Sequence, residues 1–277
     1  MLAAARWWSG GVTAEVMMAT VAAAAVWALT IWLLSLLAGR YCIVDAFWGP
    51  GFLATSVTAA MVRGWSELSQ QQALLLCLVG IWAVRLAIHL GLRIVGDPHE
   101  DRRYAAIRDG HQPGFWWKSL FLVFLLQAVI MWFVGIPVVA GLGQTGTQGH
   151  LALLLTGVLL WLLGLFFEAV GDWQLARFRS CPENRGQVLQ TGLWRYTRHP
   201  NYFGDFCVWW GLWLVAVCCG APLWSVLSPL AMAFFLLRVS GVPMLERDIG
   251  TRRPGYAEYV RRTNAFFPGP QRRSGAV

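Results

Sequence analysis

Seven apolar stretches, each long enough for a helix to cross a lipid bilayer, constrain this chain more than any other feature. A helix needs roughly 17 to 25 residues to cover about 30 Å of hydrocarbon. The stretches lie at residues 16–38, 42–62, 72–95, 116–140, 150–171, 201–219 and 222–240. With 57% hydrophobic and 13% charged residues, the composition departs from that of soluble proteins. The sequence therefore predicts an all-α polytopic membrane protein, with about seven transmembrane helices in one bundle.

The domain organisation predicted from these stretches is simple. The first stretch is longer than the apolar region of a signal peptide, so we expect it to remain in the protein. Residues 1–15 form a short leader, residues 16–268 one integral membrane domain, and residues 269–277 a basic tail that we expect to be disordered.

Positive charge is distributed unevenly when the stretches are threaded alternately through a bilayer. Of 22 lysines and arginines, Arg6 and Arg63 fall on one side and Arg85 falls within a span. All the others fall on the opposite side. By the positive-inside rule, the amino terminus lies outside and the carboxyl terminus in the cytoplasm. Because topology explains these basic residues, we expect no nucleic acid partner.

Two further patterns predict no site. Six cysteines show neither a CxxC pair nor metal-ligand spacing, so they indicate no disulfide framework and no metal site. They are Cys42, Cys77, Cys181, Cys207, Cys218 and Cys219. The stretch GLGQTG at 141–146 has the spelling of a dinucleotide-binding turn, but it joins two apolar stretches with no strand before it. We interpret it as a glycine-rich loop.

Polar and ionisable residues interrupt the apolar stretches near their predicted cytoplasmic ends. Such groups are costly at membrane depth and usually face a protein or water-filled interior. Several recur at four-residue or seven-residue steps, which place side chains on one helix face. These are Arg85, His89 and Arg93 in the third stretch, Glu168, Asp172 and Arg179 from the fifth, and Asn201 and Asp205 in the sixth. A buried ion pair that ties helices together is the structural alternative for each, but their common depth favours a cytoplasmic cavity.

The segment RYTRHPNYFGDFCVWWG, at 195–211, places cations directly before an apolar helix. Pro200 suits the first turn of a helix, with Thr197 or His199 available as a cap. The amino terminus of a helix attracts anions through its unpaired N–H groups and its dipole. Around the anion we expect Arg195, Arg198 and His199, with Asn201, Tyr202 and Asp205 one turn deeper. This layout predicts a cofactor that carries phosphate or carboxylate groups.

Three blocks of the sequence carry a family resemblance. The segment GLWRYTRHPNYFGDFCVWWG, preceded by EAVGDWQLARFR and followed by GVPMLERDIGTRRPGYAEYVRRTNAFFPG, resembles the steroid 5-alpha-reductase superfamily. With EDRRY at 100–104, it is similar to a bacterial branch of unknown function, over roughly residues 40–268. The resemblance implies a bacterial inner-membrane enzyme. In such enzymes NADPH enters from the cytoplasm and reduces the double bond of an enone lipid or steroid.

The resemblance assigns cofactor-binding residues one by one. Asp172 and Arg179 correspond to an Asp and Arg on the fifth helix, and Asn201 and Asp205 to the Asn and acid of the sixth-helix motif. Glu168 stands where steroid reductases tend to have Asn. Further cofactor contacts are implied for Arg93, Arg195, Arg198, His199, Arg253, Tyr256 and Tyr259.

The substrate end departs from the family pattern. Steroid reductases hold the ketone with a Gln-Glu pair on the second helix and a Tyr on the third, whereas here Asp45 has no preceding Gln, and Leu90 lies beside His89. Hydride addition to an enone needs an acid near the carbonyl oxygen. The candidates are His89, Tyr104 and Asp45, the last as a carboxyl kept neutral by burial. The predicted substrate is apolar: steroid-like, isoprenoid or a fatty enone.

Two alternatives remain. Isoprenylcysteine and phospholipid methyltransferases have a similar RHP-x-Y-x-G junction and a similar carboxyl-terminal block. They would use S-adenosylmethionine, with Glu246 and His199 near its amino acid part. The second alternative is a non-catalytic membrane protein with a reductase-like body, which the missing Gln-Glu-Tyr set favours. The oligomeric state is not predicted.

Overall fold

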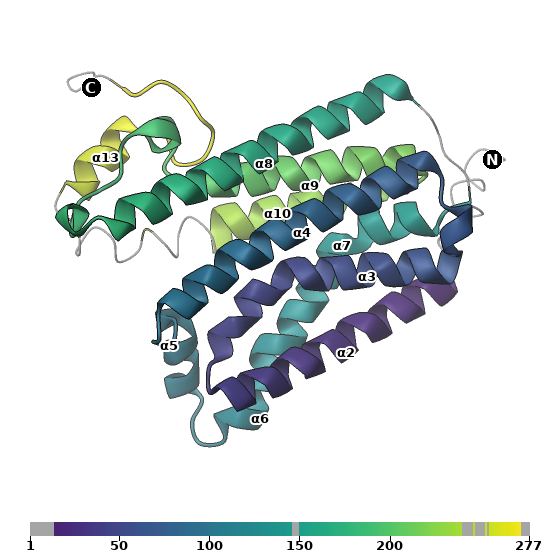
Figure 1. Ribbon diagram of the computed structural model, residues 1–277, viewed down its shortest axis with the longest axis horizontal. Helices are drawn as coiled ribbons and strands as arrows, with labels where there is room; N and C mark the ends of the chain where they lie inside the picture. Colours follow the sequence, from purple (N-terminus) through teal and green to yellow (C-terminus); the bar gives the residue numbers. More distant parts are fainter. Residues whose placement is uncertain (1–13, 146–149, 240–245, 247–252, 254, 273–277) are drawn as a thin grey trace. The chain divides into compact units, whose positions relative to one another are not determined.

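The structure is a computed structural model that describes residues 14–145, 150–239, 246, 253 and 255–272. Most of the predicted leader, Gly146 of the glycine-rich loop and the end of the predicted tail lie outside these residues. The described chain folds into α-helices and short 3-10 and π segments, and no β-strand occurs in it (Figure 1).

The helical elements follow one another along the chain with short connections. Up to residue 145 they are α2 (Ala14–Ala38), η1 (Tyr41–Phe47), α3 (Trp48–Arg63), η2 (Trp65–Glu67), α4 (Gln70–Gly96), α5 (Arg102–Gly110), α6 (Phe115–Ser119), η3 (Leu120–Leu125) and α7 (Leu126–Gly143). After residue 150 they are α8 (Leu151–Ser180), η4 (Pro182–Asn184), η5 (Gly192–Arg195), α9 (Pro200–Cys218), η6 (Leu223–Val226), α10 (Leu227–Phe234), η7 (Phe235–Val239) and α13 (Tyr256–Arg262).

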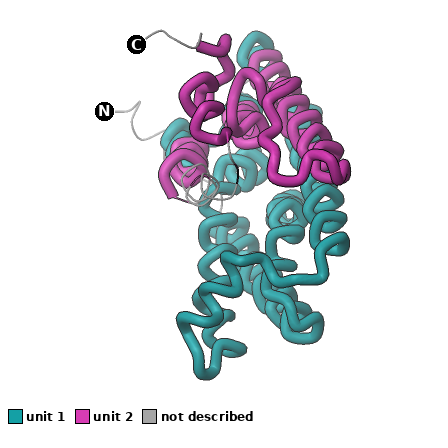
Figure 2. Tube along the Cα trace, turned by 90° about the vertical axis from the view of Figure 1, so that its left-hand side faces the viewer, with its two compact units in different colours: residues 1–154, 212–228 teal, residues 155–211, 229–277 magenta. Residues whose placement is uncertain are grey.

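The chain divides into two compact units, which Figure 2 colours separately. Unit 1 comprises residues 1–154 and 212–228, and unit 2 comprises residues 155–211 and 229–277. Each unit contains residues from the sequence-predicted site, so each is described by itself.

Helix α3 is the centre of unit 1 and packs against α2, α4 and α7. Glycines on α3 allow this close packing. A Cβ added at Gly49 would lie 2.5 Å from the carbonyl oxygen of Ala83 on α4, and one at Gly51 would collide with Met131 on α7. Phe52 and Trp82 then meet edge to face in the interior. Such small residues let membrane helices approach closely.

The second predicted span differs from the structure at its start. Residues 41–47 form the 3-10 segment η1, and the α-helix begins only at Trp48. Pro50 lies in the first turn of α3, where its missing N–H needs no intrahelical acceptor. The Gly49-Pro50 pair therefore marks a helix start, and Asp45 lies on η1 rather than within the helix.

Helices α8 and α9 pack antiparallel in unit 2 through glycines seven residues apart. An added Cβ at Gly164 would lie 2.5 Å from the carbonyl oxygen of Gly204. One at Gly211 would lie 2.7 Å from that of Gly157, and one at Gly171 would lie 3.1 Å from Pro200. The two helices therefore meet almost backbone to backbone along a seam. The seam brings the start of α9 beside the charged end of α8.

Within the described residues, four helices are long and apolar enough to cross a membrane: Ala14–Ala38, Gln70–Gly96, Phe115–Gly143 and Leu151–Ser180. Large apolar side chains are exposed along them, for example Leu33 on α2 and Leu159 on α8, as expected for surfaces that face lipid. The protein is therefore an integral membrane protein. The other three predicted spans correspond to helical segments of fewer than 20 residues: α3, α9 and Leu223–Val239.

Candidate functional site

Unit 1 contains a hydrogen-bonded cluster built on Asp45. The Tyr104 hydroxyl donates to Asp45 Oδ1 at 2.5 Å, and Arg103 Nη2 donates to Asp45 Oδ2 at 2.7 Å. The Tyr104 hydroxyl also accepts from Gln127 Nε2 at 3.2 Å. Gln127 Oε1 in turn accepts from the indole N–H of Trp48 at 2.6 Å. We call these five residues the Asp45 cluster.

The block EDRRY explains how the chain positions this cluster. Glu100 accepts hydrogen bonds from the backbone N–H groups of Tyr41 and Cys42, which anchors the start of η1. Asp101 caps helix α5 by accepting from the Arg103 N–H, and it also accepts from Arg103 Nε. Two neighbouring acids thus hold η1 and α5 side by side.

A second clamp joins the same region to helix α4. The guanidinium of Arg40 donates to the carbonyl oxygens of Ile94, Asp97 and His99, at 2.7 to 2.9 Å. It therefore satisfies one carbonyl group in the last turn of α4 and two in the connection that follows the helix. Together with Glu100, Arg40 keeps the connection between α4 and α5 against η1.

The electrostatics of the cluster keep Tyr104 protonated. Burial raises the pKa of the Tyr104 phenol well above its ordinary value, and the charge and hydrogen bond of Asp45 raise it further. Burial acts to lower the pKa of Arg103, but the charges of Asp45 and Asp101 outweigh it and raise the pKa. Asp45 accepts hydrogen bonds from both Arg103 and Tyr104. In the hydrogen bond between Tyr104 and Asp45, the Tyr104 hydroxyl is thus the group that carries the proton.

The remaining sequence candidates of unit 1 lie on α4. His89 is half-buried there, and Arg93 is exposed and pairs with Asp101 at 3.0 Å. The structure therefore joins Asp45 to Tyr104 directly and connects Arg93 to them through Asp101 and Arg103.

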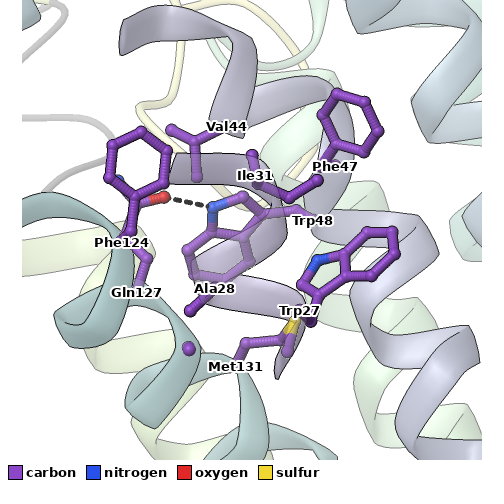
Figure 3. A pocket seen from close by; sticks show the side chains of 10 residues that line it. Trp27, Ala28, Ile31, Val44, Phe47, Trp48, Phe124, Gln127 and Met131 are labelled. Atoms are coloured by element: carbon purple, nitrogen blue, oxygen red, sulfur yellow. Dashed lines mark hydrogen bonds between the residues drawn. The ribbon is translucent and has the colours of Figure 1, made fainter. Parts of the chain in front are cut away.

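A small apolar cavity adjoins the cluster. It is lined mainly by aliphatic and aromatic side chains, with Trp48 and Gln127 presenting their hydrogen bond at its wall (Figure 3). Its volume is about 20 Å³, enough for about one water molecule. A larger apolar ligand would therefore have to displace side chains such as Trp27 or Met131.

A polar pocket lies beside Asp45. Asp45, Cys42 and Leu90 line it together with the charged residues Arg40, Arg93 and Asp101. Its volume is about 60 Å³, which accommodates several water molecules. Asp97 and His99, which also line it, are exposed to solvent. We call it the polar pocket, and the cavity at Trp48 the apolar pocket.

Unit 2 contains a second cluster, made of Arg198, His199 and Glu246. Arg198 Nε donates to Glu246 Oε1 at 2.7 Å and Arg198 Nη2 to Oε2 at 3.1 Å, while His199 Nε2 lies 2.9 Å from Oε1. Arg198 Nη1 also donates to the carbonyl oxygens of Val260 and Thr263. We call this set the Glu246 cluster. It ties the start of α9 to the chain around α13.

The Glu246 carboxylate is strongly acidic. Burial would raise its pKa, but the hydrogen bonds from His199 and Arg198 and the charge of Arg198 outweigh burial and lower the pKa to about 2. The Tyr256 phenol, whose pKa is raised by burial and by the charge of Glu246, stays protonated beside it. Most donors of Arg198 are therefore occupied within the protein, although the sequence predicted that this residue would surround an anion.

Asn201 links the two helices of the seam. Its Nδ2 donates to Asp172 Oδ1 on α8 at 3.1 Å, and its Oδ1 accepts from the Tyr202 N–H at 3.1 Å. Asp172 is buried, and so is Glu168 one turn away. Since a Cβ added at Gly204 would lie 2.8 Å from the Cγ of Glu168, the glycine makes room for the Glu168 side chain.

The other predicted cofactor residues surround this pair at various depths. Tyr202 stacks on His199, with ring centroids 5.6 Å apart, and Asp205 is half-buried one turn further along α9. Arg179 and Arg195 are exposed. Arg253 donates to the Gln187 carbonyl oxygen, and the Tyr259 hydroxyl donates to that of Trp194. The structure thus gathers Asp172, Asn201, Tyr202 and His199 at the start of α9.

The Asp45 cluster contains three residues that sequence reasoning missed. Gln127 and Trp48 lie within apolar stretches, and Arg103 belongs to EDRRY, where only Tyr104 was named as a candidate. The signal available was the lone amide of Gln127 in the run VFLLQAVIMW, at 123–132, since an amide within an apolar stretch requires partners.

The fold and these clusters define a polytopic helical membrane protein with buried polar groups near its helix ends. The chain matches the family of proteins of unknown function DUF1295 over residues 31–263, and it belongs to that family. The match confirms membership of a family of unknown function, as the resemblance implied.

One curated protein is similar to part of this chain. The cobalt-zinc-cadmium resistance protein CzcN of Cupriavidus metallidurans is 29% identical over 109 residues, which cover 39% of this chain and 48% of the relative. The chain thus spans about half the length of that protein. No solved structure matches the chain.

Proposed function

We propose that this protein is a membrane-embedded, NADPH-dependent reductase of a conjugated double bond in an apolar substrate, which is steroid-like, isoprenoid or a fatty enone. The proposal includes seven membrane spans and a cofactor cavity on the arginine-rich side, which faces the cytoplasm of a bacterial inner membrane. The positive-inside rule supports this orientation.

The observation that carries the proposal is the composition of the Asp45 cluster. Steroid reductases, which the sequence resembles, hold a ketone with a Gln, a Glu and a Tyr. Here a glutamine, a carboxylate and a tyrosine are joined by hydrogen bonds, although they come from α7, η1 and α5. The missing set was the main support for a non-catalytic protein, so a set of equivalent chemistry favours an enzyme.

Unit 2 supplies groups whose chemistry fits NADPH. The exposed guanidinium groups of Arg179 and Arg195 suit phosphate oxygens, which arginine binds with paired hydrogen bonds. The hydrogen-bonded pair Asn201 and Asp172 offers an amide and a carboxylate at the start of α9. Arg198, with most of its donors occupied by Glu246 and backbone carbonyls, would position the α13 region instead. When bound, NADPH would supply a hydride to the carbon conjugated with the carbonyl.

Unit 1 supplies the proton in this proposal. Tyr104 is kept protonated at neutral pH by burial and by Asp45, so its hydroxyl serves as the acid that protonates the enolate. Arg103 neutralises the Asp45 charge, and Gln127 orients the phenol from the other side. The apolar side chains around the cluster lower the local dielectric constant, which strengthens these hydrogen bonds.

A specific observation favours one second candidate, the S-adenosylmethionine-dependent methyltransferase. That reading placed Glu246 and His199 together at the amino acid part of the cofactor, and the two residues are in direct contact, 2.9 Å apart. However, Glu246 is paired with Arg198 as well. The carboxylate would therefore have to exchange an arginine for the ammonium group of the cofactor.

Thermal stability of the detergent-purified protein in the presence of each cofactor tests the proposal. NADPH, NADH and S-adenosylmethionine are titrated separately, because a ligand stabilises the folded state by an amount that grows with its concentration relative to Kd. We expect stabilisation by NADPH, weakened in Arg179→Ala and Asn201→Ala. The matched control is Arg177→Ala, which removes the same charge two residues earlier, where the guanidinium lies over Trp173.

Each outcome of this titration separates the candidates. Stabilisation by S-adenosylmethionine alone would replace the reductase by the methyltransferase. No response to any of the three cofactors would support a non-catalytic protein. An equal loss in Arg177→Ala and Arg179→Ala would reduce the arginine effect to general electrostatic attraction.

A further inference from the structure

Unit 1 contains two pockets of opposite character. The apolar pocket presents Gln127 and Trp48 at its wall, and the polar pocket presents Asp45 itself. The polar pocket has exposed residues at its rim and a volume of about 60 Å³, which is enough for several water molecules. A continuous line of hydrogen bonds connects the two through the Tyr104 hydroxyl.

We propose that the polar pocket is the proton entrance of the protein, and that Asp45 passes protons from its water to the Tyr104 hydroxyl. This inference rests on the proposed function for its purpose, because reduction of a double bond consumes one proton for each hydride. It goes further by identifying where that proton enters and which residue carries it.

The proton balance of the step is complete. The O–H bond of Tyr104 breaks as its proton bonds to the substrate enolate, which leaves a phenolate. Water in the polar pocket gives a proton to Asp45, and Asp45 gives one to the phenolate oxygen, which is 2.5 Å away. The hydroxide left in the pocket exchanges with solvent, so the net source of the proton is bulk water.

The surroundings of Asp45 fit a carrier of protons. Arg103 binds it directly, and Asp101 and Arg93 lie beyond Arg103. Arg40 lines the same pocket. Tyr104 is only 5% exposed and packs among apolar side chains such as Val44 and Phe124. Because apolar side chains cannot relay protons, exchange of the phenol proton with solvent depends on the polar contact with Asp45.

Exchange of the Tyr104 proton for deuterium tests this without substrate or cofactor. The protein is labelled with ring-¹³C tyrosine and moved rapidly into D₂O while the phenol bands are followed by infrared spectroscopy. Subtraction of the Tyr104→Phe spectrum identifies the Tyr104 band. We expect rapid exchange in the unmodified protein, and an exchange about tenfold slower or more in Asp45→Asn, where the phenol must wait for local opening. Asp109→Asn, at the exposed end of α5, is the matched control.

A second test blocks the polar pocket chemically and leaves Asp45 in place, so it does not depend on correct folding of the Asp45→Asn variant. The substitution Leu90→Cys places a thiol at the wall of the polar pocket. The exposed Cys77 and Cys181 are first replaced by serine. The new thiol is then modified with benzyl methanethiosulfonate. The control is Leu92→Cys, whose position is 69% exposed. Modification at Leu90→Cys should slow exchange about tenfold, because only local opening then admits solvent, and modification at Leu92→Cys should not.

Two outcomes would overturn the inference. Exchange that stays rapid with the pocket plugged would mean that protons reach Tyr104 by another route. Exchange that is slow in the unmodified protein would mean that the pocket does not connect Tyr104 to solvent. Because neither measurement uses NADPH, a failure of the reductase proposal shows in the cofactor titration alone.

Discussion

Replacement of Glu246 by glutamine should remove a large, pH-dependent part of the stability of unit 2. The folded-state pKa of Glu246 is about 2, whereas an unfolded glutamate titrates near about 4.3. At about 1.4 kcal/mol per pKa unit, this difference contributes about 3 kcal/mol. Because the folded-state pKa is lowered, the contribution is complete above about pH 5 and falls to about 1.4 kcal/mol at pH 3.

Hydrogen exchange of peptides that cover α13 measures this contribution locally. At pH 7, Glu246→Gln should exchange about 200-fold faster than the unmodified protein, the factor that corresponds to about 3 kcal/mol. At pH 3 the ratio should shrink to about tenfold. Comparison at equal pH cancels both the intrinsic exchange chemistry and all other titrating groups.

A surface variant provides the control for this measurement. Glu258 on α13 pairs with Arg261 and Arg262 of the same helix, and its side chain is 39% exposed. Exposed pairs contribute about 0 to 1 kcal/mol, so Glu258→Gln should change exchange by less than tenfold at both pH values. Equal exchange of Glu246→Gln and the unmodified protein at pH 7 would refute the reasoning, as would a ratio that does not change between pH 7 and pH 3.

Three further predictions concern packing and the Asp45 cluster. Gly204→Ala should lower the free energy of unfolding in detergent by about 1–3 kcal/mol, since the new Cβ would lie 2.6 Å from backbone atoms. The control is Gly91→Ala, which should raise this free energy or leave it unchanged, because nothing lies within 4 Å of its Cβ. Trp48→Phe should cost about 1–2 kcal/mol in the same assay, because the half-buried Gln127 oxygen loses its donor. Tyr104→Phe should leave the NADPH-induced stabilisation intact while abolishing turnover of any enone found in a screen, and loss of cofactor binding in this variant would contradict the division of roles.

Much of the helical architecture could be predicted from apolar stretch length alone. The third and sixth stretches begin and end within two residues of α4 and α9. Helix α8 continues nine residues beyond the predicted end at 171, because charged residues leave the apolar stretch but do not stop a helix. The start of the second helix was misplaced because composition outweighed the turn signal of Gly49-Pro50.

The residues of the site were easier to predict than the hydrogen bonds and ion pairs between them. Asp45 and Tyr104 were both candidates, but their separation of 59 positions gives no sign that they bond. Arg198 was assigned to an anion from its place before a helix, whereas its charge is met by Glu246, 48 positions away. Spacing along a helix reports which side chains share a face, but contacts between elements depend on packing that periodicity does not contain.

Transfer of deuterium from cofactor to substrate tests the central claim most directly. The detergent-purified protein is incubated with NADPH deuterated at the nicotinamide C4 and a set of steroid, isoprenoid and fatty enones, and the products are analysed by mass spectrometry. The account predicts a saturated ketone with deuterium on the former β-carbon, absent in Asn201→Ala and Tyr104→Phe. No deuterium in any product, or a methyl group transferred from labelled S-adenosylmethionine in a parallel incubation, would contradict it.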